Sequence, residues 1–165
     1  MADKIKPSDR ASSRSAARLA AVQALYQMDM TSIDLNDVIA EFQAHRLGQE
    51  VEGDRYHAAE DEFFHDLVDG VVHEQLRLDP MLDQQLAEGW RLNRVDSILR
   101  ALLRSAAFEI TIRDDVPARV VINEYVDIAH AFFSGDEPKV VNGVLDRLAR
   151  RERSQEFDRT VMGEG

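Results

Sequence analysis

The sequence contains no cysteine, and it has few glycines and prolines, 8 and 4 in 165 residues. The lack of cysteine excludes disulfide bonds, thiolate metal sites and a cysteine nucleophile. Long apolar runs are missing as well: the longest, Leu19–Val22, is far too short to cross a membrane. Residues 1–13 lack the apolar stretch of a signal peptide. Together these absences predict a cytoplasmic protein with no membrane anchor.

Basic charge is also scarce, with 20 Lys+Arg against 31 Asp+Glu and a formal net charge of −11. A field of that sign repels nucleic acid at long range, so nucleic-acid binding would depend on a local basic patch. The sequence has one candidate, because residues 1–30 hold five basic and three acidic residues. Within this segment arginine recurs at every fourth position, at Arg10, Arg14 and Arg18.

Apolar residues at helical spacing are present almost throughout the chain. They predict an all-α fold of about seven helices, with flexible tails at 1–9 and 154–165 around a single domain at 10–153. The predicted helices are 10–30, 35–47, 61–77, 80–89, 94–112, one opened by Pro117 and one that follows residues 134–138. Asp34 is a candidate N-cap, Asn93 with Asp96 resembles a capping box, and Asp79-Pro80 resembles a helix start. The polar residues 48–60 are predicted to form a loop.

The three arginines of the first helix span about 80° of one helical face, since residues four apart are displaced by about 40°. The predicted core stripe of this helix consists of Ala17, Ala21, Leu25 and Met28. Because the arginine face is offset from this stripe, we expect the arginines to face solvent, with Tyr26 at the edge of the same surface. Guanidinium groups bind phosphate and aromatic rings stack on unpaired bases, so the surface could bind single-stranded RNA. The alternative is an ordinary solvated face paired with acids such as Asp9.

Three stretches carry a family resemblance. Arg14–Tyr26 reads RSAARLAAVQALY, Leu102–Ile110 reads LLRSAAFEI, and Asp115–Leu148 contains INE and VNGVLD. These motifs, in this order, resemble those of the NusB family of transcription antitermination factors. The first is similar to R-x-x-A-R-x-x-A-x-Q-A-L-Y, and the second to L-R-x-A-x-Y-E-L, with Phe108 where tyrosine is usual.

The resemblance implies an all-helical fold of two packed three-helix bundles, and no catalysis. It also implies binding of boxA, a short single-stranded RNA at the start of ribosomal RNA transcripts. NusB-like proteins bind boxA jointly with NusE, which is also a ribosomal protein of the small subunit. The pair acts within an RNA polymerase antitermination complex that reads through termination sites.

Carried onto this sequence, the resemblance also implies the RNA-facing residues. Together with Arg10 from the arginine spacing, the predicted RNA-binding residues are Arg10, Arg14, Arg18, Tyr26, Asp136, Glu137 and Lys139. Lys139 lies near a predicted helix N-terminus, whose free N–H groups favour phosphate. Asp136 has two open roles, as the cap of that helix or as the acceptor of a hydrogen bond from a base edge.

Four positions depart from the family pattern in ways that remove charge or stacking. Ser15 and Ala16 occupy positions that can be basic, His130 stands where lysine is frequent, and Val140 replaces a common aromatic residue. We therefore expect weaker RNA binding by the chain alone and a greater dependence on NusE. A homodimer that buries the arginine face until RNA arrives is also possible.

Two other functions compete with this interpretation. Glu62-x-x-His65 and Asp127-x-x-His130 each place a carboxylate and a histidine at i, i+3, a spacing found in metal-binding helical bundles. Against a metal site, the Phe63-Phe64 pair between the first two ligands predicts that the aromatic rings, rather than the ligands, face the core. The other alternative is a stand-alone RNA-binding module that partners an RNA-modifying enzyme.

Several polar or small residues are predicted to be structural. Arg104 and Glu109 are expected to specify the fold, and Asn123 with Glu124 to satisfy buried polar groups. A close approach of two helices would explain Gly143, and the arginines at 147–153 are expected to form a solvated helix end.

Overall fold

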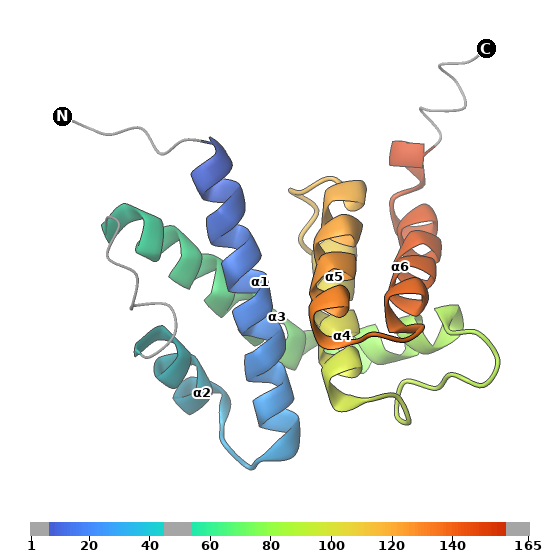
Figure 1. The fold of residues 1–165 in the computed structure, drawn as a ribbon, viewed down its shortest axis with the longest axis horizontal. Helices are drawn as coiled ribbons and strands as arrows, with labels where there is room; N and C mark the ends of the chain where they lie inside the picture. Colours follow the sequence, from blue (N-terminus) through green and yellow to red (C-terminus); the bar gives the residue numbers. More distant parts are fainter. Residues whose placement is uncertain (1–6, 45–53, 158–165) are drawn as a thin grey trace. The chain divides into compact units, whose positions relative to one another are not determined.

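The computed structural model describes residues 7–44 and 54–157, and it describes the side chains of residues 13–44 and 61–157 (Figure 1). Within these ranges the secondary structure is helical and contains no strand, which confirms the all-α prediction. The α-helices are α1 (Pro7–Met30), α2 (Leu35–Phe42), α3 (Asp54–Gln85), α4 (Ser97–Thr111), α5 (Ala118–Phe132) and α6 (Glu137–Glu152). Over the described part of the chain, every helix is too short or too polar to span a lipid bilayer.

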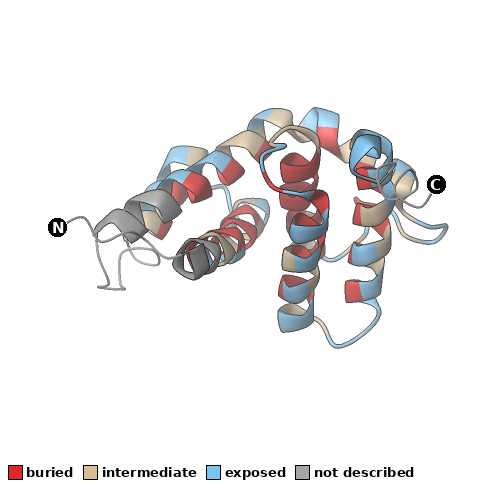
Figure 2. Cartoon of the chain, turned by 90° about the horizontal axis from the view of Figure 1, so that it is seen from above, coloured by how far each residue is buried: buried red, intermediate tan, exposed pale blue. Residues whose placement is uncertain are grey.

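The chain divides into two compact units, Met1–Val72 and His73–Gly165. The first unit holds α1, α2 and the first part of α3, and α1 packs against α2. The second unit holds the rest of α3 with α4, α5 and α6, and the last three helices contact one another. Along most of the helices buried and exposed positions alternate at helical spacing, as amphipathic sequences require (Figure 2).

The first unit is held together by small and aromatic side chains. Alanines 17, 20, 21 and 24 of α1 are buried, so the backbones of neighbouring helices can approach closely. Phe42 of α2 stacks on Phe64 of α3 with ring centroids 5.7 Å apart, and both rings are almost fully buried. Burial of one such ring stabilises the fold by about 1.5–3 kcal/mol. The predicted N-cap of α2 is confirmed, since Asp34 Oδ1 accepts a hydrogen bond from the Asp37 N–H at 3.0 Å.

The second unit is built around α4, in which every residue from Ala101 to Ile110 is buried. Two of these residues are charged, and each has a partner. Arg104 donates two 2.8 Å hydrogen bonds to the carboxylate of Asp79, and Glu109 accepts one at 2.6 Å from the Tyr125 hydroxyl. Paired in this way, Arg104 and Glu109 stabilise the packing of α4, as predicted. The N-cap of α4 is Asp96, whose carboxylate accepts from the Ile98 N–H at 2.8 Å, and not the predicted Asn93.

The helix α3 differs most from the prediction. The loop expected at 48–60 is wrong for residues 54–60, which are helical, and residues 45–53 lie outside the described residues. The expected break at Asp79-Pro80 is also wrong, because α3 continues through Pro80 for 32 residues in all. Proline inside a helix removes one hydrogen bond, but Leu78 and Leu82, both 0% exposed, anchor this part of the helix in the core of the second unit.

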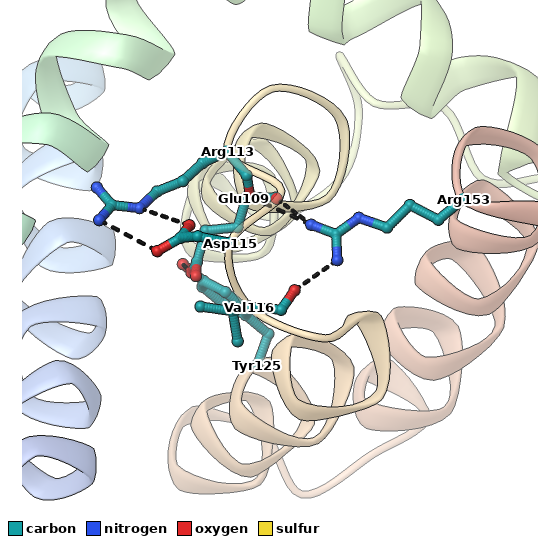
Figure 3. A network of polar contacts seen from close by, with 6 residues as sticks. All are labelled: Glu109, Arg113, Asp115, Val116, Tyr125 and Arg153. Atoms are coloured by element: carbon teal, nitrogen blue, oxygen red, sulfur yellow. Dashed lines mark hydrogen bonds and ion pairs between the residues drawn. The ribbon is translucent and has the colours of Figure 1, made fainter. Parts of the chain in front are cut away.

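The end of α6 is fastened to the turn between α4 and α5 by Arg153 (Figure 3). Its guanidinium donates hydrogen bonds to the backbone carbonyls of Glu109, Ile110, Arg113 and Val116. Glu156 accepts from Arg153 at 3.2 Å and from the backbone N–H of Ala118, at the start of α5, at 3.1 Å. Residues 154–157, within the predicted C-terminal tail, form a helical turn. The expectation of a solvated helix end is therefore wrong for Arg153, whose side chain is 8% exposed.

Candidate nucleic-acid interface

The arginines of α1 meet one aromatic ring of α3. The guanidinium carbon of Arg14 lies 4.7 Å from the centroid of the Phe63 ring, and that of Arg18 lies 5.1 Å from the same centroid. Both distances are within the range of cation–π interactions. Phe63 is 3% exposed, so the ring belongs to the core of the first unit. The same ring makes a cation–π contact with each of the two guanidinium groups.

The two arginines differ in exposure. Arg14 is half-buried, whereas Arg18 is 2% exposed and is among the largest fully buried side chains of the described residues. The expectation that the arginines face solvent is therefore wrong for Arg18. The predicted core stripe was too narrow: counted at about 100° per residue from Ala17, Arg18 lies at about 100°, between Leu25 at about 80° and Val22 at about 140°. Because Leu25 and Val22 are both buried, Arg18 is inside the apolar arc.

Tyr26 and Arg10 complete the candidate residues of α1. Tyr26 is half-buried and lies 12 residues after Arg14, about 18 Å along the helix and about 120° around it. The helix therefore does not place the Tyr26 ring beside Arg14. Arg10 lies in α1, but its side chain is outside the described part of the structure.

The second candidate patch lies at the N-terminus of α6. Asp136 occupies the N-cap position, yet its exposed carboxylate makes no capping hydrogen bond. The carboxylate of Glu137 turns back over Gly135, where an added Cβ would lie 2.9 Å from Glu137 Oε2. Lys139 is exposed and Pro138 is buried beside it. The patch thus offers one ammonium group, two carboxylates and the free N–H groups of a helix terminus.

The neighbouring arginines of α6 do not extend this patch. Arg147 donates to the backbone carbonyl of Gln85 at 2.6 Å, and its guanidinium occupies the space above Gly143. Gly143 therefore makes room for an arginine side chain, and the predicted close approach of two helices is wrong. Arg150 pairs with Asp146 at 2.9 Å, a contact within the helix surface.

Further predictions concern two polar residues of α5 and Val140 of α6. Asn123 is exposed, so it does not satisfy a buried group, whereas Glu124 is half-buried. Val140, in place of the aromatic residue common in the family, is half-buried.

The residues of the alternative metal site lie on the surface. Glu62 and His65 are exposed, and so are Asp127 and His130. Between the first two, Phe63 and Phe64 turn into the core, as predicted. In the part of the chain that the structure describes, no three His, Asp or Glu side chains are grouped so that they could hold a metal ion.

The missed residues are Phe63 and Arg153. Phe63 was identified only as an apolar neighbour of Glu62 and His65, and nothing in its spacing connects it to arginines that lie about 45 positions earlier. Arg153 follows the last apolar position of α6 among other charged residues. No local signal distinguishes it from them.

Comparisons with known proteins give a consistent result. Residues 15–150 match the profile of the NusB family. A protein of Rhodopseudomonas palustris (strain BisB18) is 57% identical over 154 residues, which cover 93% of this chain and 91% of that protein. A protein of Nitrobacter hamburgensis is 58% identical over 150 residues, covering 91% of this chain and 94% of its own. Both relatives are named transcription antitermination protein NusB.

Solved structures with a similar fold include T. maritima NusB, with 28% identity and a TM-score of 0.73 over 88% of this chain and 96% of that chain. A chain from a crystal structure of antitermination factors NusB and NusE in complex with double-stranded RNA has a TM-score of 0.67. It covers 85% of this chain and 98% of its own, and at 23% identity it supports the fold alone.

Proposed function

Because this chain belongs to the NusB family, we propose that it is a transcription antitermination factor that acts without catalysis in the cytoplasm. It binds the boxA-type single-stranded RNA of ribosomal RNA transcripts together with ribosomal protein NusE. The complex then promotes read-through by RNA polymerase. The observation that carries this proposal is the match to relatives named as antitermination proteins, which extends over more than nine-tenths of the chain.

The α1 patch supports the RNA-binding part of the proposal. Arg14 is half-buried and its guanidinium lies over the Phe63 ring, and a guanidinium at a partly exposed position is the group that best suits paired contacts to phosphate. Arg10 precedes it by one turn and Tyr26 supplies an aromatic ring that could stack on a base. Arg18 would have to leave its buried position to contact RNA, so we assign it to the fold of the first unit.

The α6 patch supports the same function through different chemistry. Lys139 and the free N–H groups at the helix terminus suit a phosphate. Since the Asp136 side chain makes no capping bond, its carboxylate is available to accept a hydrogen bond from a base edge. Glu137 completes the proposed RNA-binding residues, although its carboxylate lies over Gly135 in the free protein.

The proposal is tested by fluorescence anisotropy of a labelled boxA RNA titrated with the full chain, with and without NusE. A scrambled RNA of the same length is the control. We expect boxA to bind more tightly than the scrambled RNA and the difference to grow with NusE. Equal binding of the two RNAs in the presence of NusE would contradict the proposed function.

A further inference from the structure

Residues 86–96, which join α3 to α4 (Figure 1), are fixed at Leu92. The Leu92 side chain is 2% exposed, its N–H donates to Asp83 Oδ1 at 3.0 Å, and its carbonyl accepts from Arg100 Nη1 at 3.3 Å. Because Asp83 belongs to the last turn of α3, the first of these bonds holds the segment against the end of that helix. The exposed residues on either side of Leu92 therefore extend from a fixed support.

Arg91 and Arg94 are the exposed basic residues of this segment. Other arginines of the second unit are paired, such as Arg104 with Asp79 at 2.8 Å. Among the described residues, neither Arg91 nor Arg94 takes part in a side-chain hydrogen bond or an ion pair. Two exposed guanidinium groups three residues apart, on a fixed segment, suit an anionic ligand with more than one acceptor group, such as a phosphodiester chain.

Two further arginines reach the same end of α3 from α6. Arg147 Nη2 donates to the Gln85 carbonyl at 2.6 Å, and Arg151 Nη1 donates to Gln84 Oε1 at 2.8 Å. Both arginines are exposed. Printed beside one another in the fold but not in the sequence, these residues form what we call the arginine cluster: Arg91, Arg94, Arg147 and Arg151.

Acidic residues of the same elements set the charge balance around the cluster. They are Asp83, Glu88, Asp96, Asp146 and Glu152. Asp83 and Asp96 each accept a backbone N–H group, and Asp146 pairs with Arg150 at 2.9 Å. With Arg150 included, five arginines balance five acids here, whereas the whole chain has a formal net charge of −11. A polyanion is therefore not repelled at the cluster as it is by the chain as a whole.

Trp90, directly before Arg91, adds an aromatic ring. It is half-buried, so part of the indole can stack on an unpaired base. We propose that the arginine cluster and Trp90 form a second RNA-binding surface, which binds the single strand that adjoins boxA through its phosphates and one base. The inference rests on the proposed function. The surface is distinct from the α6 patch, since Arg147 follows Lys139 by eight residues, about 12 Å along the helix.

The test compares boxA RNA with boxA extended at its 5′ or its 3′ end by about ten unstructured nucleotides, a length that a single-strand surface can occupy. Anisotropy is measured with the full chain and NusE. We expect one of the extended RNAs to bind about threefold to tenfold more tightly than boxA alone, the range for two exposed ionic contacts. Arg91→Gln with Arg94→Gln should abolish this gain and leave the affinity for boxA alone within about twofold. It should also reduce the salt dependence for the extended RNA by about 1.4 in log–log slope, or two phosphate contacts.

The matched control is Arg77→Gln with Arg119→Gln, which removes the same charge at two exposed positions of the second unit outside the cluster. We expect it to keep the gain. Trp90 is the only tryptophan of the chain, so its fluorescence gives a second readout without NusE. The extended RNA should quench this fluorescence more strongly than boxA alone, because only the longer strand reaches the indole.

The outcomes separate this surface from the proposed function. No gain from either extension, or an equal loss in the control variant, would overturn the second surface, while preference for boxA over scrambled RNA would still support the function. Unchanged Trp90 fluorescence with both extended RNAs would likewise overturn it. Binding of a labelled hexaglutamate peptide by the cluster, with no gain from extended RNA, would assign the surface to an acidic protein instead. Equal binding of boxA and scrambled RNA with NusE would contradict both proposals.

Discussion

At the scale of single residues, Arg14 and Arg18 show that equal spacing does not give equal roles. One turn separates them, and both meet Phe63, yet one is half-buried and the other is 2% exposed. Both carry the charge that defined the basic stripe in the sequence. Only one retains the exposure that a phosphate contact needs.

Replacement of each arginine by methionine, which keeps the apolar stem, separates these roles. Arg18→Met should lower the free energy of unfolding by about 2 kcal/mol, because it removes a buried guanidinium and its cation–π contact with the Phe63 ring. Arg14→Met should cost less than about 1 kcal/mol of stability but reduce the salt dependence of RNA binding by about 0.7 in log–log slope, the value of one phosphate contact on a single strand. Urea unfolding and anisotropy at several salt concentrations measure the two quantities. Identical behaviour of the two variants in both measurements would contradict this assignment.

The sequence predicted some of these residues and not others, for a physical reason. Arg104 and Glu109 could be identified because they are charged residues among the apolar residues of α4, so each needs a partner if the helix is buried. Arg18 could not, because alanines allow neighbouring helices to approach α1 over an arc wider than the predicted stripe. The width of a buried arc depends on what packs against the helix, and a single helix sequence does not contain that information.

At the scale of helices, local signals located most elements and misplaced α3. The starts of α2, α5 and α6 lie within a few residues of their predicted positions, because caps and prolines act locally. Asp79-Pro80 carries the same local signal but lies inside α3. There the Asp79 carboxylate binds Arg104, and buried leucines on either side of Pro80 retain the helix. Tertiary contacts override the start signal.

The ends of α4, α5 and α6 depend on one another through Arg153, and this dependence can be measured. Arg153→Met leaves four carbonyl groups, two in the last turn of α4 and two in the α4–α5 turn, without their guanidinium donor. We expect a loss of about 2–3 kcal/mol in the free energy of unfolding, as for buried polar groups left unsatisfied. The control is Arg150→Met in the same helix, whose exposed pair with Asp146 contributes about 0.5 kcal/mol or less. Urea unfolding of both variants measures the difference, and equal losses would show that Arg153 is no more than a surface residue.

At the scale of the whole molecule, the family resemblance anticipated the composition of the fold better than its division along the chain. The all-α class and the grouping of helices into bundles follow from motifs spread over residues 14–148. The boundary between the units falls within α3, at Val72 and His73, and the helix runs through Gly70 and across this point without a break. A continuous helix that belongs to two cores has no linker for sequence analysis to detect.

The net charge of −11 also makes a prediction about unwanted partners. Because the acidic surface repels polyanions, duplex DNA should displace boxA RNA only at concentrations above about 10⁻⁴ M, the weak limit of ordinary non-specific binding. The matched variant reverses two exposed acids of the second unit, Asp114→Lys with Asp127→Lys. We expect it to bind duplex DNA more tightly and to discriminate less between boxA and scrambled RNA. Competition anisotropy measures both, and unchanged competition by DNA would show that the acidic surface plays no part in selectivity.

The contact of Arg153 with the α4–α5 turn has a consequence for the order of events during synthesis. The chain emerges from the ribosome N-terminus first. The carbonyl groups of Glu109 and Val116 therefore lack their hydrogen-bond donor until Arg153 has been synthesised, 44 and 37 residues later, respectively. Until then, the second unit has its apolar residues but lacks the Arg153 guanidinium, which binds the carbonyl groups of the α4–α5 turn. A nascent chain arrested a few residues before Arg153 would display this open turn to chaperones and proteases, whereas the completed chain conceals it.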